Sequence, residues 1–293
     1  MHAGFIGLGR MGTGMARRLL DAGHDLAVLD VVAARTTLLA EAGARAASST
    51  ADLCNGREVV ITMLVDDGGL TEVALGRGGL RDSMARGAIH IVMGTHGVAA
   101  VRALAEGHAG AGQTLVAAHV LGRPDLAAAG QLGIVAAGPE AAVTRCQPLF
   151  DVMGRRTFHA GPSPESATAI KLANNAVLGC AMVAMAEGFA LVRKYGVVPQ
   201  VFQDVMTEGL FAAPAYKVYG QKMVDRSWDQ VGSPIHVGLK DAILIAAAAD
   251  LARVPMPSHN VYRDRLLGAV AHGDGDRDQA VLALEQARAS GLE

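Results

Sequence analysis

Cysteine is scarce in this chain of 293 residues, and so are aromatic side chains, which make up 4% of it. The three cysteines, Cys54, Cys146 and Cys180, lie far apart and form neither a redox pair nor a metal-binding pattern. Such cysteines are typical of reduced thiols in a cytosolic protein, so we expect a cytoplasmic location and no disulfide framework. No three His, Asp, Glu or Cys residues have metal-site spacing, and we therefore predict no metal.

Charged residues are also few, at 18%, and the net charge is −2 without any basic run. The sequence therefore lacks the electrostatic pattern expected of a protein that binds nucleic acid or an anionic membrane surface. The N-terminal segment enters a strand pattern without the basic and apolar regions of an export signal. The longest apolar stretch, residues 176–186, is too short to cross a bilayer, so we expect no membrane partner.

Hydrophobic residues make up 51% of the chain, which suits a helix-rich globular protein or an oligomer. Up to about residue 159, short β-type runs alternate with stretches of helical periodicity. This alternation predicts βαβ units, and hence an α/β domain with a doubly wound, mostly parallel sheet covered on both faces. The expected strands cover residues 4–8, 25–30, 58–64, 88–93, 114–118 and 132–138.

The character of the sequence changes at Gly161. Helix-compatible residues continue from Pro164 to about Tyr195, and at ~1.5 Å per residue such a helix would extend ~45 Å. A helix longer than a small domain is wide must link domains or cross into a partner. We therefore predict an α/β domain over residues 1–162, a long interdomain helix, and an all-α substrate and dimerisation domain over residues 163–293, interleaved in a homodimer.

A glycine-rich turn follows the first expected strand. Gly7, Gly9 and Gly12 have G-x-G-x-x-G spacing and open a helical pattern. Alone, this spacing also fits an ordinary turn, but with Asp30 at the end of the second strand it indicates a Rossmann-type dinucleotide-binding domain. Gly7 permits the tight turn, Gly9 lets the backbone approach a pyrophosphate, and Gly12 allows close packing of helix on strand, while the helix N-terminus attracts the phosphates. The predicted cofactor contacts include the intervening residues Leu8, Arg10 and Met11.

Asp30 can accept hydrogen bonds from both hydroxyls of an adenosine ribose, and its carboxylate would repel a 2′-phosphate. The next two residues are valines and supply no cation, and Arg35 lies further on, so we predict NAD over NADP. The alternative role for Asp30 is the N-cap of the next helix. Met63 and Leu64 end a later strand and are predicted to support the cofactor through their backbone; the alternative is a buried strand that simply leads into a turn.

Seven segments of the sequence are distinctive: GFIGLGRMG at residues 4–12, TML at 62–64, GTHGV at 94–98, AAAGQL at 127–132, IKLANN at 170–175, GLKD at 238–241 and HGDGDRD at 272–278. Together they resemble the β-hydroxyacid dehydrogenases, the family of 3-hydroxyisobutyrate dehydrogenase and tartronate semialdehyde reductase, with imine reductases as relatives. The resemblance covers nearly the whole chain and implies an NAD(P)-dependent oxidoreductase that acts on a small-molecule substrate.

By this resemblance, Lys171 is the catalytic acid/base, Asn175 helps to hold the substrate, and Thr95 and Lys240 belong to the cofactor site. In oxidation a neutral lysine accepts the hydroxyl proton, and in reduction its ammonium returns that proton. Apolar surroundings and a positive nicotinamide ring would both lower the pKa of such a lysine from its reference value near ~10.4. Asn175 lies one helical turn further along the same face. The alternative is a structural lysine whose tip reaches solvent.

Two segments depart from the family pattern where its members cradle the substrate carboxylate. Gly94 replaces the serine of the family's Asp-x-Ser-Thr segment. In the segment that follows, a second serine has become Leu121 and a glycine has become Arg123, next to Gly122. We therefore expect these residues to form an atypical substrate pocket, for a substrate that is bulkier or less acidic than usual.

These changes leave two alternative functions open. An imine reductase would explain the lost serines, although such relatives usually carry aspartate or tyrosine at the position of Lys171. A non-catalytic dinucleotide-binding scaffold is the other alternative, and the pairing of Lys171 with Asn175 argues against it. We interpret His96 and His119 as hydrogen-bonded structural residues, with substrate contact as the alternative.

Overall fold

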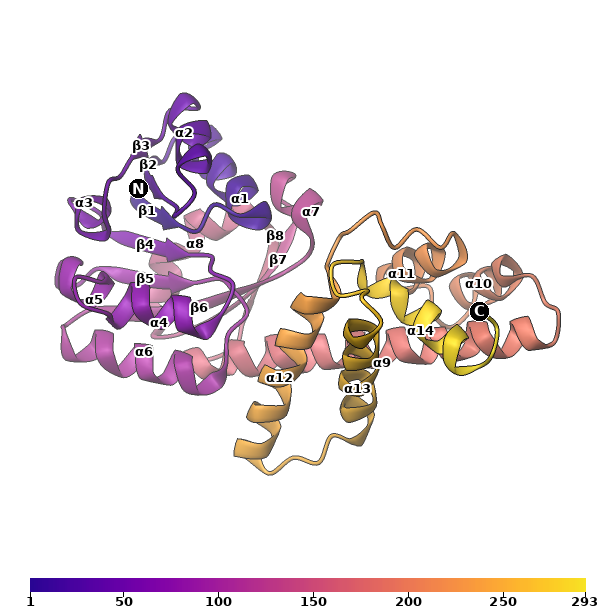
Figure 1. Cartoon of the computed structure of the whole chain (residues 1–293). Helices are drawn as coiled ribbons and strands as arrows, with labels where there is room; N and C mark the ends of the chain where they lie inside the picture. The colour runs from indigo at the N-terminus through magenta and orange to yellow at the C-terminus, as the bar shows by residue number, and fades with distance from the viewer. The chain divides into compact units, whose positions relative to one another are not determined.

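The computed structural model describes all 293 residues and divides into two compact units, residues 1–171 (unit 1) and 172–293 (unit 2). Unit 1 contains an eight-stranded sheet with helices, and unit 2 is helical (Figure 1). The strands are β1 (His2–Ile6), β2 (Asp25–Leu29), β3 (Arg45–Ala46), β4 (Val59–Thr62), β5 (Ile89–Val92), β6 (Thr114–Leu121), β7 (Leu132–Ala137) and β8 (Gly154–His159).

The helices of unit 1 are α1 (Arg10–Asp21), α2 (Ala33–Glu41), α3 (Thr50–Cys54), α4 (Asp67–Leu75), α5 (Leu80–Ser83), α6 (Val98–Gly110), α7 (Pro124–Ala128) and α8 (Glu140–Met153). The long helix α9 (Pro164–Lys194) begins in unit 1 and continues in unit 2, which agrees with the predicted interdomain helix. Unit 2 adds α10 (Pro199–Glu208), α11 (Pro214–Val224), α12 (Ile235–Ala252), α13 (Pro257–Ala271), the short 3₁₀-helix η1 (Gln279–Val281) and α14 (Leu282–Ala289).

The sheet has the strand order β3-β2-β1-β4-β5-β6-β7-β8, and only β6 and β7 pair in antiparallel fashion. The structure thus confirms the predicted doubly wound, mostly parallel sheet. The chain leaves β1 toward β2 on one side and later returns to β4 on the other. In open α/β sheets, ligands bind beyond the carboxyl ends of the strands at such a reversal.

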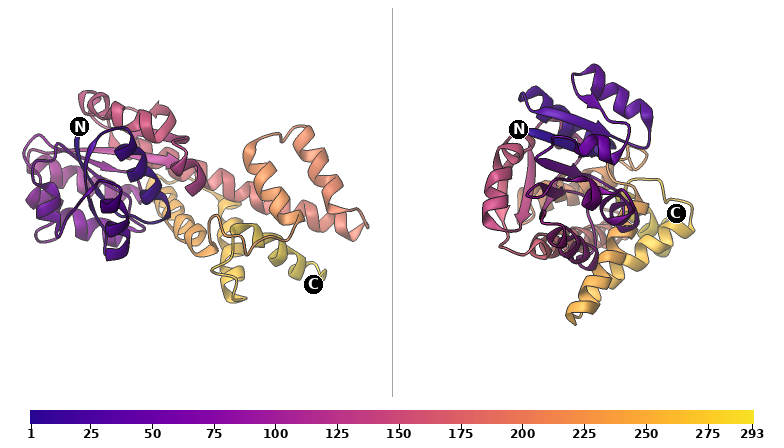
Figure 2. Two further views of the ribbon diagram at one scale, coloured as in Figure 1. Left: turned by 90° about the horizontal axis from the view of Figure 1, so that it is seen from above. Right: turned by 90° about the vertical axis from the view of Figure 1, so that its left-hand side faces the viewer.

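Helices lie on both sides of the sheet of unit 1 (Figure 2), and alternate residues of its central strands face opposite layers. On β4, Val59 and Ile61 pack in the same cluster as buried residues of α1, α2, α7 and α8, whereas Val60 faces the side of α3 and α5. The α4 and α6 helices, with the start of α9, cover the second face further along the sheet. Because both faces are covered, the strands read as continuous apolar runs, which made them predictable from the sequence.

Strand β8 was not among the strands expected from the sequence. Its residues Gly154–His159 read GRRTFH and are mostly exposed, since β8 pairs only with β7 at the edge of the sheet. An edge strand with charged side chains lacks the apolar run that marks a buried strand. The two-residue β3 at the opposite edge was missed for the same physical reason.

A buried polar chain crosses the second face of unit 1. The Gln113 amide donates to two backbone carbonyls, so its oxygen must accept from His108 Nδ1 at 2.7 Å. His108 Nε2 then accepts from His90 Nδ1 at 2.9 Å, and His90 Nε2 accepts from the Thr62 hydroxyl at 2.9 Å. Every ring nitrogen is paired, and this single direction of donation requires both histidines to be neutral. Burial is the main cause that lowers the pKa of each ring, that of His90 well below its ordinary value.

Unit 2 has its own apolar core, formed mainly by methionine, aromatic and alanine side chains of α9 to α14. Gly179 of α9 lies so close to Tyr262 of α13 that an added Cβ would fall 2.4 Å from the ring. The small residue therefore allows the two helices to approach closely. An all-α second part of the chain agrees with the sequence prediction.

By length and composition, α9 is apolar enough to cross a membrane, since an 18-residue window has a mean hydropathy of 1.7. The expectation based on residues 176–186 was therefore too narrow. A core helix of a soluble protein passes the same test, and 44% of this window is buried within the protein.

Candidate active site

The three glycines of the first turn have different surroundings. Gly7 has φ +95°, and a Cβ there would fall 2.4 Å from the Met63 carbonyl oxygen. A Cβ on Gly12 would fall 1.9 Å from the Gly7 carbonyl oxygen, so the start of α1 rests directly on the turn. Gly9, in contrast, would meet no heavy atom within 4 Å. Two glycines are thus required by packing, while the third borders open space into which another group can come close to the backbone.

The N-terminus of α1 lies beside the open space at Gly9 and also suits a bound phosphate group. Gly9 occupies the N-cap position and offers no side chain to the N–H groups of the first turn, which also contains no acidic residue. The Thr13 hydroxyl donates to the Leu8 carbonyl oxygen at 2.7 Å and fixes the loop instead. An uncapped helix start beside open space is a suitable site for a phosphate group.

Asp30 ties the end of β2 to the glycine-rich turn. Its carboxylate accepts from the Leu8 backbone N–H at 2.6 Å and from the Val32 N–H at 2.8 Å, and its side chain is only 5% exposed. The N-cap of α2 is Val32, which removes the alternative role for Asp30. The Arg35 guanidinium lies 3.4 Å from the same carboxylate, closer than its sequence position suggested. A cation is therefore available beside the predicted ribose site.

Leu64 and Gly94 follow neighbouring strands and lie against each other. A Cβ at Gly94 would fall 2.5 Å from the Leu64 carbonyl oxygen and 2.5 Å from Nε2 of His96. The His96 ring is fully buried, and its Nδ1 donates to Asp67 at 3.1 Å, while Nε2 has no hydrogen-bond partner. The Gly94 position therefore has no room for the serine side chain of the family pattern.

His119 joins β6 to the beginning of α9. Its Nδ1 must donate to the Gly94 carbonyl oxygen, at 2.6 Å, because a carbonyl can only accept. Its Nε2 forms a hydrogen bond of 2.8 Å with the Thr168 hydroxyl. The ring is fully buried and hydrogen-bonded at both nitrogens, which matches the structural role expected for it.

Lys171 lies one turn beyond Thr168 on α9, and its side chain is partly buried. The Nζ atom donates to the Val120 carbonyl oxygen at 2.8 Å. Val120 lies at the carboxyl end of β6, the edge of the sheet that also carries Gly7 and Gly94. The amine is therefore held by a backbone carbonyl at this edge of the sheet.

The remaining residues of the predicted substrate segment follow β6 directly. Leu121 ends the strand, and Gly122 has φ +150°, where an added Cβ would fall 2.7 Å from the Leu132 side chain. Arg123 holds the N-cap position of α7, where its guanidinium lies 3.2 Å from the carboxylate of Asp125. A cation thus remains near the end of β6, although Asp125 partly neutralises it.

In unit 2, the predicted residues Asn175 and Lys240 meet at a carboxylate. The Asn175 amide donates to Asp241 Oδ2 at 2.8 Å, and the Lys240 ammonium lies 2.8 Å from Oδ1 of the same residue. Asp241, the last residue of the GLKD segment, was not among the predicted site residues. Its position next to Lys240 in the GLKD segment could have suggested a role for Asp241. Its contact with Asn175, however, joins two residues that are 66 positions apart in the sequence.

The glycine-rich turn, uncapped helix and sheet reversal define a dinucleotide-binding α/β protein. Residues 2–161 match the family model described as the NAD binding domain of 6-phosphogluconate dehydrogenase. Residues 166–284 match the model described as NAD-binding of NADP-dependent 3-hydroxyisobutyrate dehydrogenase. The chain belongs to the β-hydroxyacid dehydrogenase family and is an NAD(P)-dependent oxidoreductase, as the resemblance implied.

Individual relatives support this membership. The uncharacterized oxidoreductase YfjR of Bacillus subtilis (strain 168) is 36% identical over 282 residues, which cover 96% of this chain and 98% of that protein. The 3-hydroxyisobutyrate dehydrogenase of Pseudomonas aeruginosa is 38% identical over 204 residues, or 70% of this chain and 68% of that protein. The crystal structure of 3-hydroxyisobutyrate dehydrogenase (ygbJ) from Salmonella typhimurium has a TM-score of 0.86 at 26% identity and covers 97% of this chain and 99% of that one.

Proposed function

We propose that this protein transfers a hydride between NAD and a β-hydroxy acid or related alcohol/carbonyl pair, with Lys171 as the general acid/base. The observation that carries the proposal is the contact of the Lys171 amine with the Val120 carbonyl oxygen. This contact supports a position for the amine at the carboxyl edge of the sheet, where the glycine-rich turn also lies. A proton-carrying group is needed beside the carbon that exchanges hydride.

The residues of unit 1 suit a dinucleotide. The open space at Gly9 and the uncapped start of α1 fit a pyrophosphate, and Asp30 fits the adenosine ribose. The bound nicotinamide would supply the hydride acceptor in oxidation and the donor in reduction. Lys171 would take the hydroxyl proton of the alcohol and return it to the carbonyl oxygen in the reverse direction. The Val120 carbonyl can hold one N–H in either protonation state, so the amine stays oriented in both directions.

Asn175 is proposed to bind the substrate. Since its amide nitrogen donates to Asp241, its carbonyl oxygen is directed to accept a hydrogen bond. A substrate hydroxyl group can supply that donor. Lys240, which shares Asp241, is proposed to assist the cofactor site.

The crowded position of Gly94 supports a substrate pocket without the family's serine. Leu121 adds apolar surface where a second serine is usual, and Arg123 supplies a cation that is 35% exposed. We therefore propose a hydroxy acid, or a related alcohol, with a larger apolar part than the usual family substrate. Gly122, between these two residues, gives the segment its left-handed turn.

NAD remains the proposed cofactor in preference to NADP, because the Asp30 carboxylate would repel a 2′-phosphate. Arg35 beside Asp30 reduces this repulsion, so we expect a preference for NAD and not an exclusion of NADP. Thr95, Met63 and Leu64, which follow β4 and β5, are proposed to line the cofactor site at the same edge.

The activity can be tested with purified protein, NAD or NADP, and a panel of 3-hydroxy acids and alcohols, in which the absorbance of reduced cofactor is followed. We expect turnover on at least one hydroxy acid with a higher kcat/KM with NAD. Reduction of a cyclic imine with a strong preference for NADPH would instead favour an imine reductase, which the missing serine keeps open. Tight NADH binding without turnover on any carbonyl compound would favour a non-catalytic scaffold.

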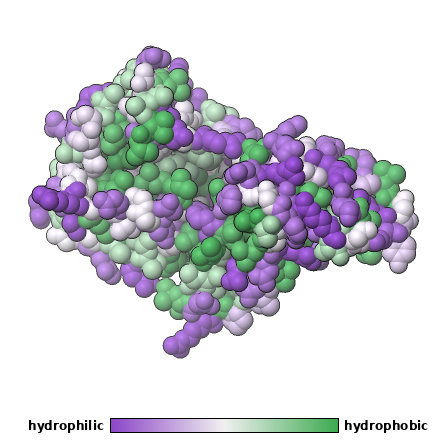
Figure 3. Space-filling view, in the orientation of Figure 1, coloured by the Kyte–Doolittle hydropathy of each residue, from purple (hydrophilic) through white to green (hydrophobic).

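A homodimer is proposed through the helices of unit 2. Large apolar side chains remain exposed on this unit, over α12 among other places (Figure 3): Val177, Leu191, Val201, Val205, Ile243, Leu251 and Val261. Contiguous apolar surface usually marks an interface. Sedimentation should give a dimer, and a monomer at micromolar concentration would contradict this. We propose a cytoplasmic location, because the three free cysteines, two of them buried, suit a reducing compartment.

A further inference from the structure

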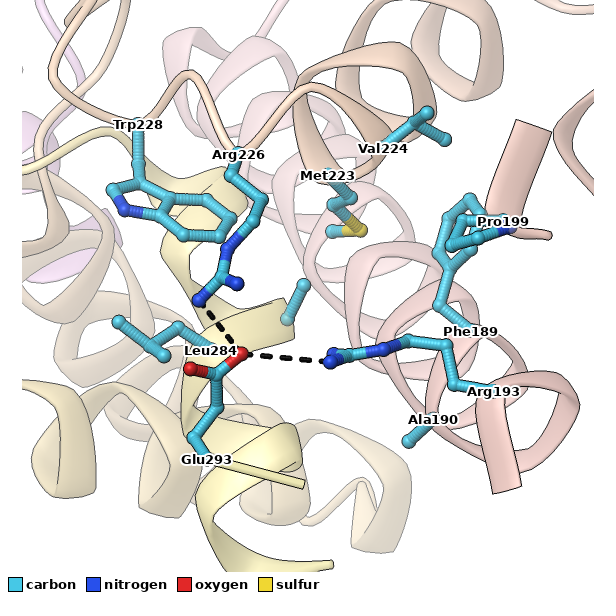
Figure 4. A pocket seen from close by; sticks show the side chains of 11 residues that line it. Phe189, Ala190, Arg193, Pro199, Met223, Val224, Arg226, Trp228, Leu284 and Glu293 are labelled. Atoms are coloured by element: carbon cyan, nitrogen blue, oxygen red, sulfur yellow. Dashed lines mark ion pairs between the residues drawn. The ribbon is translucent and has the colours of Figure 1, made fainter. Parts of the chain in front are cut away.

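Unit 2 contains a pocket of about 220 Å³ whose residues have no part in the proposed catalysis (Figure 4). The ends of α9 and α11 and the start of α14 surround it. Apolar side chains form its walls, among them Phe189, Met223, Trp228 and Leu284. A concave apolar pocket with a few convergent polar groups is the usual form of a small-molecule site.

The polar groups of this pocket are two arginines that converge on one carboxylate oxygen. The Arg226 guanidinium lies 2.6 Å from Oε1 of Glu293, and that of Arg193 lies 3.5 Å from the same atom (Figure 4). The hydrogen bond from Arg226 is the main cause that lowers the pKa of Glu293, so the carboxylate is ionised at neutral pH. Two positive side chains thus face one negative side chain.

The backbone of Arg226 is also unusual, since its φ of +52° lies in the left-handed region that favours glycine. Its guanidinium lies 5.5 Å from the centre of the Trp228 ring and reaches the carboxylate beyond it. Arg253 has a similar φ of +56° after α12, but it is exposed and makes no ion pair. At Arg226, the strained backbone thus holds a charged group at the pocket, and strain of this kind is often stored at functional sites.

We propose that this pocket binds a small organic carboxylate with an apolar body. In the structure, the Glu293 carboxylate stands in for the carboxylate of that ligand. Since a protein cavity of ~150 Å³ can hold benzene, a pocket of about 220 Å³ has room for a ligand of somewhat more than six non-hydrogen atoms. The ligand would displace Glu293 from Arg193 and Arg226 and place its apolar body against Phe189 and Trp228.

The proposal can be tested by titration calorimetry of the full-length protein with hexanoate, and with hexanamide as the uncharged probe. Glu293→Gln removes the internal competitor while it keeps the shape of the side chain. If Glu293 occupies the arginine pair about nine-tenths of the time, this variant should bind hexanoate about tenfold more tightly than the wild type. Hexanamide should not bind to either protein.

Two matched variants separate this pocket from the active site. Arg226→Gly and Arg253→Gly both relieve a left-handed backbone, but only Arg226→Gly should abolish hexanoate binding. Arg193→Gln should weaken binding independently of backbone strain. Equal hexanoate affinity of Glu293→Gln and the wild type, equal binding of hexanamide, or hexanoate binding retained in Arg226→Gly would each overturn the proposal. The last result would mean that hexanoate binds at the active site only.

Discussion

The glycine-rich turn and the Gly94 segment both use glycine at the same edge of the sheet, but for opposite reasons. At Gly9, the missing side chain leaves open space beside a helix start. At Gly94, the space is already filled by the His96 ring and the Leu64 carbonyl. The proposed cofactor end of unit 1 therefore borders open space, whereas the position of the family's serine is filled by a buried histidine. This difference is the basis of our proposal that the cofactor chemistry is conventional and that the substrate is not.

The largest effect is expected from a change within the turn. Gly12→Ala places a Cβ 1.9 Å from the Gly7 carbonyl oxygen, so α1 must shift. We expect a loss of about 1–3 kcal/mol in the free energy of unfolding, together with loss of cofactor binding. Gly9→Ala should lose cofactor affinity but cost only about 0.5–1 kcal/mol, as for an altered N-cap. Denaturant unfolding and NADH titration measure both quantities, and equal destabilisation by the two changes would remove the proposed distinction.

At the substrate end, Gly94→Ser should cost about 1–3 kcal/mol of stability, because its Cβ meets both the Leu64 carbonyl oxygen and His96. Adding His96→Ala removes one of these two contacts. The double variant should therefore regain part of the loss, with a coupling energy of about 0.5–3 kcal/mol measured by urea unfolding. Gly110→Ser, at a glycine with open surroundings, is the matched control. Strict additivity of the two changes would show that His96 does not fill the Gly94 site.

The buried histidines of unit 1 also differ in their hydrogen bonding. His96 lacks a partner at Nε2, whereas His90 and His108 are paired at both nitrogens. The pKa values of His90 and His108 are lowered in the folded protein. Below the ordinary histidine pKa of about 6.5, the unfolded chain therefore binds more protons than the folded one. The contribution of these two neutral histidines to the free energy of unfolding should therefore be fully present above that pH. It should fall as the pH decreases, by up to about 1.4 kcal/mol per histidine and pH unit.

Urea unfolding at pH 7.5 and 5.5 measures this loss of stability. A variant with His90→Gln and His108→Gln should show a smaller difference between the two pH values than the wild type. The same difference in both proteins would assign the pH dependence to other groups.

A smaller effect is expected at the ribose site. Arg35→Ala removes the cation next to Asp30 without touching the turn. The ratio of kcat/KM for NAD to that for NADP should increase about 2- to 5-fold, the range of an ion pair at a largely exposed side chain. Arg17→Ala on the exposed face of α1 serves as the control. A decreased ratio would mean that Arg35 supports NAD.

Much of unit 1 was predictable because its strands are apolar on both faces and because turn, helix and Asp30 follow one another in the sequence. The edge strand β8 was not predictable, since its arginines are exposed to solvent. The helical second half and the extent of α9 followed from its uninterrupted helical residues, which end at Lys194.

Contacts between distant segments could not be read from the sequence. The carboxylate of Asp241 joins Asn175 and Lys240, and Arg35 lies beside Asp30, only once the chain is folded. The serine missing at position 94 was visible in the sequence, but the ring that occupies its place was not. Short sequence patterns, such as the glycine spacing, predict the local backbone conformation well. They carry little information on which polar side chains from distant segments form contacts.

The most direct measurement of the central claim is hydride transfer by Lys171→Met with the identified substrate. If the Lys171 amine carries the proton, this variant should bind NADH as tightly as the wild type while its single-turnover rate falls by about 10²–10⁴-fold. Lys217→Met, on exposed surface of α11, should retain the wild-type rate. A Lys171→Met protein that binds NADH normally and transfers hydride at the wild-type rate would contradict the account.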